Sequence, residues 1–471
     1  MSKEEVLFTR ERADKYIADN KKFVNPRFKP RYHAAAPLGW ANDPNGAIYF
    51  KGKYHLFYQF YPYAPLWGPM HWGHLTSKDL ITYTDENVAL APDLSDEHGC
   101  FSGGAIVKNN ELILMYTKHY EGDYKRECQN IARSKNGFTF KKDNRPFLTS
   151  KDLPLDAVIT DFRDPMPVNL DGVYYVLVGS KTHDDIGQIV VYKSLDLKTF
   201  NYHFTIGPDR RFGVMGECPS FLRFKDKDVL IVSGINMPRI GNEFKKSNSS
   251  AAFIGKIDFI NKQYQLNIVH EIDAGHDFYA PHVFTDKDEN YVMHAWMNMW
   301  NKTYFTALNG DGWTGAFVLP RMVFFADKRL WQTPIKSVYA YFEKEMPLVN
   351  NMKISKWSHL SFATSGNDFE VIISVKHNDY IVFGQEGGSF FFDSTNHINF
   401  PQTKIYSNVP RGKLKVEVFL DSSSIEIFLN DGYETMTNLI YFYEDEYKVT
   451  LKNEQELTNA YVRKFKGGKD V

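Results

Sequence analysis

Three carboxylates stand beside or near prolines at well-separated points of the chain: Asp43-Pro44, Asp164-Pro165 and Glu217-Cys218-Pro219. A residue directly before proline is pushed towards extended backbone, so the directions of Asp43 and Asp164 are restricted. If these carboxylates converge, their repulsion raises the proton affinity of at least one of them. One protonated acid beside one ionised carboxylate is the pairing that cleaves glycosidic bonds. Taken singly, each Asp-Pro pair is equally consistent with ordinary turn chemistry.

Aromatic residues crowd the same segments, where they could form one wall of a sugar pocket. They are Trp40, Trp67, Trp72, Phe101, Trp296 and Trp300. Aromatic faces stack on the apolar side of a sugar ring, and Asn42, Gln59, Arg163 and Asp277 could bind its hydroxyls. Packing in a core is the alternative for any one of these tryptophans. Their clustering beside the carboxylates favours the pocket.

The segments that carry these residues repeat along the chain. Each has a polar or acidic residue in a turn, an apolar strand, a short turn and a second strand, which is a hairpin pattern. The marker residues of the five repeats are Asp43, Ser102, Asp164, Glu217 and Asp277, separated by steps of 59, 62, 53 and 60 residues. A second repeated segment, seven residues long with Ser first and an aromatic residue last, starts at Ser77, Ser134 and Ser194. The period is therefore close to sixty residues.

Two hairpins in each sixty-residue unit predict a four-stranded antiparallel sheet, and five such sheets predict a five-bladed β-propeller. Equivalent positions in different blades lie on a common ring. The marker residues should therefore meet at one mouth of the central channel.

The remaining segments divide the chain into four parts. Residues 1–29 form an N-terminal arm with a short helix. Thr9 could cap this helix, and Ala13, Tyr16 and Ile17 share one of its faces. Residues 30–335 form the propeller. Residues 336–350 are a linker, and residues 351–471 form a C-terminal antiparallel β-sandwich, so the fold class is all-β. Alternating apolar residues over 414–429 predict a half-buried hairpin. Further strands are expected at 368–376, 389–393, 439–443 and 446–451.

Composition excludes several other classes of function. There are 56 Lys and Arg against 57 Asp and Glu, a net charge of −1, which leaves no basic excess for nucleic acid. No apolar run reaches the roughly 18 residues of a membrane span, and the first residues are too charged for a signal peptide, so we expect a cytoplasmic protein. The three cysteines have no zinc spacing, His71 and His74 lack a zincin helix, and no nucleotide motif occurs. We expect no cofactor and no metal.

Several motifs together resemble those of glycoside hydrolase family 32, the invertases and related β-fructosidases. They are Trp40-Ala41-Asn42-Asp43-Pro44-Asn45-Gly46, the run 67–74, Phe101-Ser102-Gly103, Arg163-Asp164-Pro165, Glu217-Cys218-Pro219, Asp277-Phe278-Tyr279-Ala280-Pro281 and Leu319-Pro320-Arg321. They occur in the family's order, and residues 414–432 resemble its C-terminal sandwich. Ala41 and Gly104 are small departures from the family pattern, and neither removes a carboxylate.

The resemblance implies hydrolysis of terminal β-D-fructofuranosides with retention of configuration. Asp43 would be the nucleophile, Glu217 the acid/base and Asp164 the transition-state stabiliser. By the same resemblance, eight residues would line the fructose subsite: Asn42, Gln59, Trp67, Phe101, Ser102, Arg163, Asp277 and Trp296. A carboxylate nucleophile implies a covalent fructosyl-enzyme that water then cleaves.

Two alternatives stay open at this point: an inverting five-bladed glycosidase of the arabinanase or xylosidase type, and a non-catalytic sugar-binding propeller. The expected partner is a small sugar, namely sucrose, sucrose 6-phosphate or a short fructo-oligosaccharide, and the oligomeric state is not predicted. A phosphate on the glucosyl unit would need cations at the pocket rim. Lys118, His119, Lys125 and Arg126 are candidates for that contact, although the pattern favours ordinary charges of a solvated loop.

Overall fold

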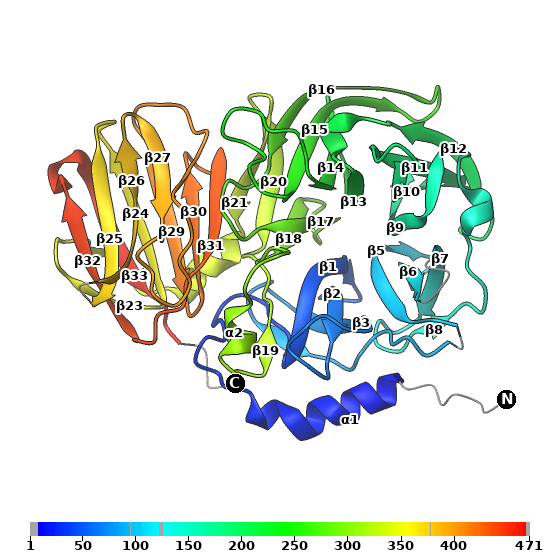
Figure 1. The fold of residues 1–471 in the computed structure, drawn as a ribbon, viewed down its shortest axis with the longest axis horizontal. Helices are drawn as coiled ribbons and strands as arrows, with labels where there is room; N and C mark the ends of the chain where they lie inside the picture. Colours follow the sequence, from blue (N-terminus) through cyan, green and yellow to red (C-terminus); the bar gives the residue numbers. More distant parts are fainter. Residues whose placement is uncertain (1–7, 95, 122–125, 377, 468–471) are drawn as a thin grey trace.

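The computed structural model describes residues 8–94, 96–121, 126–376 and 378–467. Strands dominate, and they form two bodies that lie side by side in Figure 1: five small sheets around a central axis, and two larger sheets packed face to face. This arrangement confirms the predicted five-bladed propeller followed by an antiparallel sandwich. Among the described residues, no helix is long and apolar enough to cross a membrane.

Five sheets make up the propeller, in chain order. The first contains β1 (Gly39–Phe50), β2 (Lys53–Tyr61), β3 (His71–Ser77) and β4 (Tyr83–Asp85), and the second β5 (Gly99–Lys108), β6 (Glu111–Tyr120), β7 (Arg126–Ser134) and β8 (Lys141–Lys142). The third contains β9 (Ala157–Leu170), β10 (Val173–Thr182), β11 (Gly187–Ser194) and β12 (Asn201–Ile206). The fourth contains β13 (Met215–Arg223), β14 (Asp228–Ile235), β15 (Asn248–Asp258) and β16 (Gln263–Glu271), and the fifth β17 (Tyr279–Thr285), β18 (Tyr291–Trp296), β20 (Arg321–Ala326) and β21 (Arg329–Pro334).

The first strand of each blade lies innermost, and these five strands form a closed ring. β1 contacts β5, β5 contacts β9, β9 contacts β13, β13 contacts β17, and β17 returns to β1. A short strand from the last blade's connection, β19 (Trp313–Thr314), also pairs in parallel with β1. The end of the propeller is thereby joined to its beginning.

The apolar blade strands follow from this packing, because every blade lies between two neighbours and buries both faces. In β6, Leu112 and Leu114 pack towards Phe57 of the first blade. The alternate residues Ile113 and Met115 pack towards the third blade. The strand therefore shows a continuous apolar run instead of alternation.

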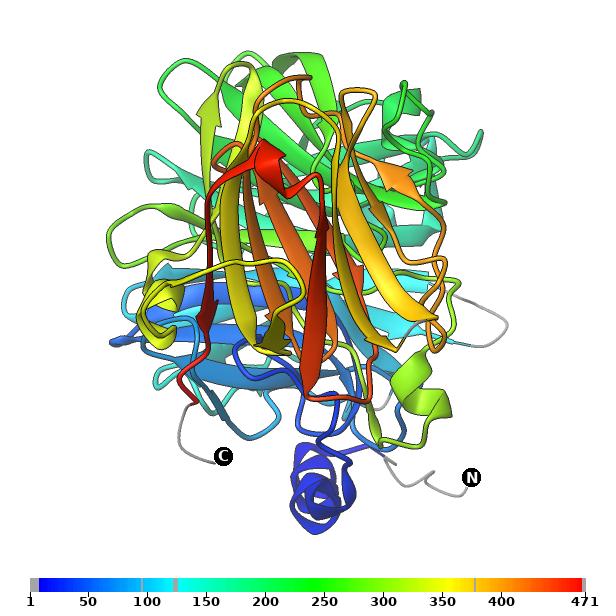
Figure 2. The same cartoon turned by 90° about the vertical axis from the view of Figure 1, so that its left-hand side faces the viewer.

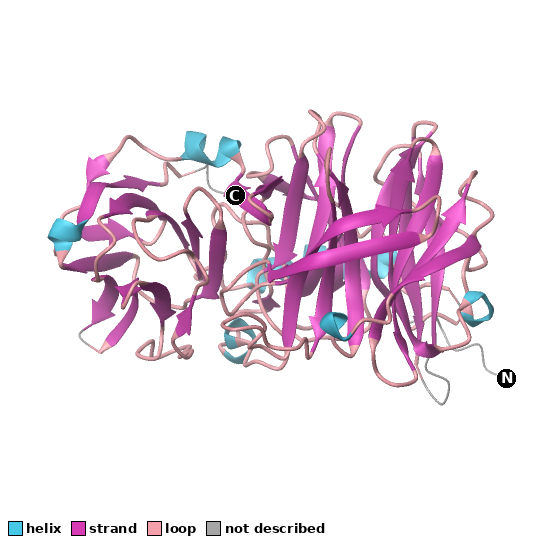
Figure 3. Ribbon diagram, turned by 90° about the horizontal axis from the view of Figure 1, so that it is seen from above, coloured by secondary structure: helices cyan, strands magenta, loops and turns pink. Residues whose placement is uncertain are grey.

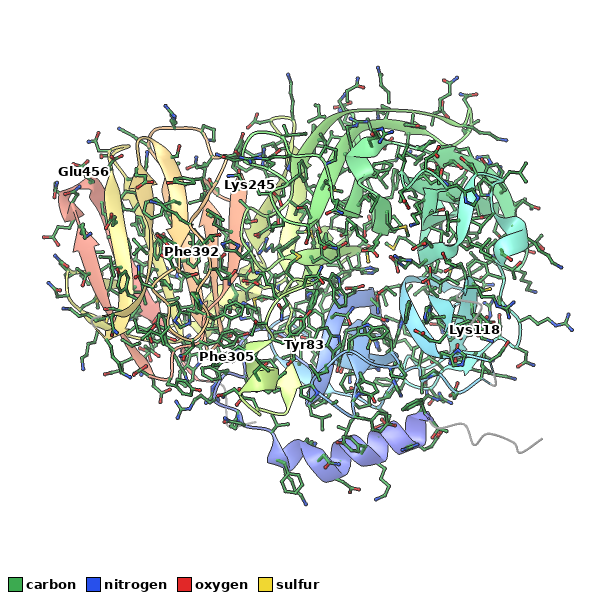
Figure 4. The ribbon with its side chains drawn as sticks, in the orientation of Figure 1. Tyr83, Lys118, Lys245, Phe305, Phe392 and Glu456 are labelled. Atoms are coloured by element: carbon green, nitrogen blue, oxygen red, sulfur yellow. The ribbon has the colours of Figure 1, made fainter. Side chains whose placement is uncertain are left out.

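The sandwich consists of two six-stranded sheets, seen edge-on in Figure 3 and from its outer side in Figure 2. One contains β22 (Met346–Pro347), β33 (Leu457–Lys464), β24 (Ser358–Thr364), β29 (Lys415–Asp421), β30 (Ser424–Leu429) and β31 (Glu434–Leu439). The other contains β23 (Lys353–Ser355), β32 (Glu446–Lys452), β25 (Phe369–Lys376), β26 (Asp379–Glu386), β27 (Ser389–Asp393) and β28 (Ile405–Tyr406). Phe392, labelled in Figure 4, is one of the fully buried residues between them.

The hairpin predicted over 414–429 is present as β29 and β30, but the prediction that it is half-buried is wrong for β30. All six residues of β30, and all six of β31, are buried. Their polar faces pack against the propeller, where Glu426 binds the guanidinium of Arg321. The strand predicted at 439–443 is also wrong, because β31 ends at Leu439 and the next residues are irregular.

Helices are few and short. The predicted N-terminal helix is α1 (Arg10–Asn20), and Thr9 Oγ1 accepts a hydrogen bond from Arg12 N at 3.2 Å as its cap. Ala13 is buried beneath it, and Tyr16 and Ile17 pack beside it. The other helix is α2 (Phe305–Leu308), and 3₁₀ turns are η1 (Lys21–Phe23), η2 (Ser150–Asp152), η3 (Arg210–Phe212), η4 (Lys336–Tyr341) and η5 (Glu454–Glu456). The connector after the propeller thus contains η4 and then β22, which already pairs with the sandwich strand β33.

Candidate active site

Every innermost strand is interrupted by a β-bulge or register irregularity at its polar motif. The breaks in pairing fall between Ala41 and Pro44, Phe101 and Gly103, Arg163 and Met166, Glu217 and Ser220, and Tyr279 and His282. A bulge puts extra residues into one strand and re-aims their side chains. Repeated around a ring, it turns polar side chains out of the ladders and towards the axis.

These side chains surround a cavity of about 280 Å³ at the mouth of the propeller channel. All five blades contribute to its wall. The lining residues are Asn42, Asp43, Gln59, Trp67, Phe101, Ser102, Glu127, Arg163, Asp164, Glu217, Tyr279 and Trp300. The structure therefore brings together the three predicted carboxylates and six of the eight predicted fructose-binding residues.

Asp43 has one engaged oxygen and one free oxygen. Its Oδ2 accepts a hydrogen bond from Ser102 Oγ at 2.7 Å and lies 3.6 Å from Cys218 Sγ. Its Oδ1 is buried and has no hydrogen-bond partner among the described residues. Burial raises the pKa of Asp43, and the nearby Ser102 hydroxyl counteracts that rise. A fixed carboxylate with one desolvated, unshared oxygen is suited to attack an electrophilic carbon.

Asp164 occupies a strained and buried position. Its φ is +66°, a left-handed conformation that non-glycine residues seldom adopt. Its Oδ2 accepts a hydrogen bond from Cys218 N at 2.8 Å, and its own amide donates to Thr117 Oγ1 at 2.9 Å. Burial raises its pKa to about 7, and the negative charges of Glu217 and Asp43 act in the same direction against the attraction of Arg163.

Glu217 is held by a partner on each oxygen. Arg163 Nη2 and Nε donate to Oε1 at 2.8 and 3.2 Å, and the Tyr279 hydroxyl donates to Oε2 at 2.6 Å. The Tyr279 hydroxyl in turn accepts a 3.4 Å hydrogen bond from Asn248. These contacts fix the direction of a side chain that has to exchange a proton at a defined place.

Glu127 is a cavity residue that the sequence did not indicate. It lies in β7, the third strand of its blade, and its Oε2 accepts hydrogen bonds from Arg163 Nη1 at 3.0 Å and Phe162 N at 2.9 Å. Burial opposes its ionisation, but Arg163 and His119 outweigh burial and lower its pKa to about 2. Only the closure of the fold brings this strand to the cavity, so no motif could have found it.

Asp277 and Trp296 lie behind the cavity and are absent from its lining. Asp277 is fully buried, where it accepts hydrogen bonds from Lys302 Nζ at 2.7 Å and from Gln402 and Leu439 of the sandwich. Trp296 is buried against Trp300, with ring centroids 4.9 Å apart. In the fifth repeat the break in strand pairing follows Tyr279, just as it follows Glu217 in the fourth repeat. Tyr279 is therefore the residue of the fifth blade that is equivalent to Glu217. Its place in the Asp277-Phe278-Tyr279 motif was the available sequence signal.

Comparison with known proteins agrees with this site. The family model of the glycosyl hydrolases family 32 N-terminal domain matches residues 33–334, and that of the family's C-terminal domain matches residues 340–466. The chain belongs to glycoside hydrolase family 32. The resemblance inferred from the motifs is thus confirmed, and the protein is a glycoside hydrolase.

Similar members of family 32 span nearly the whole chain. A sucrose-6-phosphate hydrolase from Zymomonas mobilis is 32% identical over 87% of this chain and 86% of its own length. A raffinose invertase from Escherichia coli is 32% identical over 90% of this chain and 91% of its own. A solved family 32 β-fructofuranosidase from Bombyx mori has a TM-score of 0.88 at 29% identity, covering 97% of this chain and 98% of that one.

Lys118, His119 and Arg126, the described members of the set proposed from the sequence as phosphate contacts, do not line the cavity of this family 32 protein. Lys118, labelled in Figure 4, lies 2.6 Å from Asp96 through its Nζ. His119 stacks on the ring of Phe101, with ring centroids 3.9 Å apart. Arg126 lies over the ring of Tyr120, and Lys125 falls outside the described residues.

The pair of histidines with metal-like spacing is packed in the first blade. His71 donates from Nδ1 to Pro69 O at 2.8 Å, and His74 Nε2 lies 2.9 Å from His55 Nδ1. Within the described part of the chain, no group of three or more His, Cys, Asp or Glu residues could hold a metal ion.

Proposed function

We propose that the protein hydrolyses terminal β-D-fructofuranosides of the sucrose type through a covalent fructosyl-enzyme, with retention of configuration. The observation that carries the proposal is the set of three carboxylates in one cavity, with Asp43 Oδ1 enclosed and unshared. The names of the relatives, a sucrose-6-phosphate hydrolase and a raffinose invertase, support a fructoside as substrate.

In the first step, Asp43 Oδ1 attacks the anomeric carbon of the fructosyl unit while the bond to the leaving sugar breaks. Glu217 gives its proton to the departing oxygen. Because Arg163 occupies Oε1, the proton resides on Oε2, where the Tyr279 hydroxyl can turn to accept. Ser102 and Cys218 hold the other oxygen of Asp43, so the nucleophile keeps its direction.

In the second step, the ionised Glu217 takes a proton from water, and the oxygen of that water attacks the same carbon and releases Asp43. Asp164 accepts hydrogen bonds from fructose hydroxyls and stabilises the positive charge that develops on the ring. Trp67, Phe101 and Trp300 supply the apolar wall.

The two alternatives give different outcomes in one experiment. Proton NMR during sucrose hydrolysis identifies the anomer of fructose that is released first. We expect β-fructofuranose first, as retention requires, whereas first release of the α anomer would favour the inverting glycosidase. Binding of sucrose without release of glucose would favour the non-catalytic propeller.

The variant Asp43→Asn is the companion test, because it keeps the shape of the nucleophile and removes its charge. We expect a loss in kcat of about 10⁴-fold with an unchanged melting temperature. Retention of most activity would show that Asp43 is not the nucleophile.

A further inference from the structure

Acidic side chains outnumber basic ones in the wall of the cavity. Four of its lining residues are carboxylates, Asp43, Glu127, Asp164 and Glu217, and among the described lining residues Arg163 alone is cationic. That guanidinium already touches Glu217, Glu127 and Asp161, so its charge is fully matched. A further anion entering this space would meet unmatched carboxylates.

The contacts place Glu127 beyond the catalytic acid as seen from the nucleophile. Asp43 and Asp164 both touch Cys218, Glu217 touches Arg163, and Glu127 lies on the next edge of the same guanidinium. Fructose has to lie over Asp43, and the leaving sugar has to extend past Glu217, which protonates its oxygen. Glu127 therefore faces the leaving sugar.

One oxygen of Glu127 is available to that sugar. Phe162 N and Arg163 Nη1 both donate to Oε2. Oε1 lies 3.5 Å from Nδ1 of His119, and that nitrogen has no hydrogen-bond partner among the described residues. The side chain of Glu127 is only 1% exposed, so a bound sugar would exclude the remaining water from it. A hydrogen bond from a hydroxyl to a buried carboxylate is among the strong ones.

We propose that Glu127 determines the choice of leaving group: it accepts a hydrogen bond from a hydroxyl of an uncharged leaving sugar and repels a phosphorylated one. This inference rests on the proposed function. It selects sucrose and similar neutral fructosides over sucrose 6-phosphate, although several relatives are named for the phosphorylated sugar. Three described basic side chains do not offset the repulsion, since Lys118 is paired with Asp96, Lys181 is paired with Asp161 and Asp185, and Arg126 lies over Tyr120.

The test compares kcat/KM for three substrates: methyl β-D-fructofuranoside, sucrose and sucrose 6-phosphate. We expect the parent enzyme to prefer sucrose over its 6-phosphate by at least tenfold. In Glu127→Gln we expect the ratio of phosphate to sucrose to rise at least tenfold and the ratio of sucrose to the methyl fructoside to fall about tenfold. An effect transmitted through Arg163 to Glu217 cancels in the ratio of sucrose 6-phosphate to sucrose, because both substrates lose the same anomeric oxygen of glucose and need the same help from the acid.

Asp161→Asn is the matched control, because Asp161 also touches Arg163 Nη1, at 3.2 Å, but does not line the cavity. We expect its ratios to stay within twofold of the parent. A parent that prefers the phosphate, or unchanged ratios in Glu127→Gln, would overturn the inference. If Glu127→Gln does not fold, product inhibition of the parent enzyme tests the inference instead. We expect glucose to inhibit more strongly than glucose 6-phosphate, and the reverse order would overturn the inference. A parent that cleaves none of the three substrates would instead refute the proposed function.

Discussion

At the scale of single residues, Asp164 shows how this site trades stability for chemistry. The residue combines a left-handed φ of +66° with near-complete burial and two neighbouring carboxylates. Each of these features costs free energy in the folded state. They persist because the propeller holds Asp164 where it can act on a fructose ring bound over Asp43.

The raised pKa of Asp164 predicts how the stability of the variant Asp164→Asn depends on pH. The pKa of Asp164 is about 7 when folded against 3.8 for an ordinary aspartate, so the native state binds the extra proton between these values. Stability of the parent therefore falls as pH rises from about 4 to about 7, and the variant lacks this fall. We expect equal melting temperatures near pH 4, a more stable variant near pH 8, and a loss in kcat on the order of 10³-fold. A melting-temperature difference that does not change with pH would contradict the assigned pKa.

At the scale of elements, the bulges in the five innermost strands decide which residues face the cavity. The sixty-residue period was readable from the sequence, because each blade repeats the same hairpin pattern, and four of the five polar motifs contain a carboxylate. The register of the fifth repeat was not readable. Asp277 resembles the other acidic markers by type, but the pairing breaks after Tyr279, two residues later.

Other parts of the site and fold depend on contacts between elements that no local pattern records. Glu127 reaches the cavity from β7, the third strand of its blade. The outward face of β30 carries Glu426, which alternation assigns to solvent, yet the propeller covers it. Sequence therefore predicted the strands and the carboxylates, whereas the burial of β30 and the inward direction of Glu127 depend on how blades and sandwich close on one another.

The loop between β18 and α2 shows how the sandwich supports the cavity. This loop carries Trp300, which lines the cavity and stacks on Trp40. Two residues later, Lys302 Nζ donates to Asp277 Oδ1 at 2.7 Å and to Gln402 Oε1 of the sandwich at 3.0 Å. Asp277 thus anchors the loop instead of touching the cavity.

From this anchor we expect Gln402→Ala to raise KM for sucrose by about three- to tenfold with little change in kcat. The substitution loosens the Trp300 wall but leaves the Lys302–Asp277 ion pair and the carboxylates in place. Asn399→Ala is the matched control, since its side chain bonds Tyr441 O in the same region without touching Lys302. Steady-state kinetics on both variants provide the measurement. An unchanged KM in Gln402→Ala would mean that the sandwich does not support the wall.

At the scale of the whole molecule, buried charges hold the two bodies together. Arg321 of the propeller is fully buried between the rings of Phe278 and Phe428, and its guanidinium binds Asp273 and Glu426. His33, just ahead of the first blade, joins the same network through Glu426. Removing one member would leave a buried charge without its partner, which is strongly destabilising. The sandwich and propeller should therefore unfold together.

A second group at this interface makes the joint stability depend on pH. Glu434 of β31 is 2% exposed, and its Oε2 lies 3.5 Å from Arg329 of β21. Burial raises its pKa to about 8, and the charges of Glu243 and Glu271 reinforce burial against the attraction of Arg329. Because an ordinary glutamate ionises near 4.5, the folded protein retains a proton that the unfolded chain has lost between pH 4.5 and about 8. The stabilisation from that proton is complete below pH 4.5 and disappears as pH rises through 8.

Glu434→Gln mimics the protonated state at every pH, so it should remove this dependence. We expect melting temperatures equal to the parent's near pH 4.5 and higher by several degrees at pH 8, with one cooperative transition because the two bodies unfold together. Calorimetry of both proteins at matched ionic strength from pH 4.5 to 9 measures the difference. Glu446→Gln is the control, because that residue is exposed in the same body and its only described ion pair is with Lys353 on the surface. A gain in stability that is the same at pH 4.5 and pH 8 would mean that Glu434 is already ionised in the folded protein and that Arg329, not a retained proton, compensates its burial.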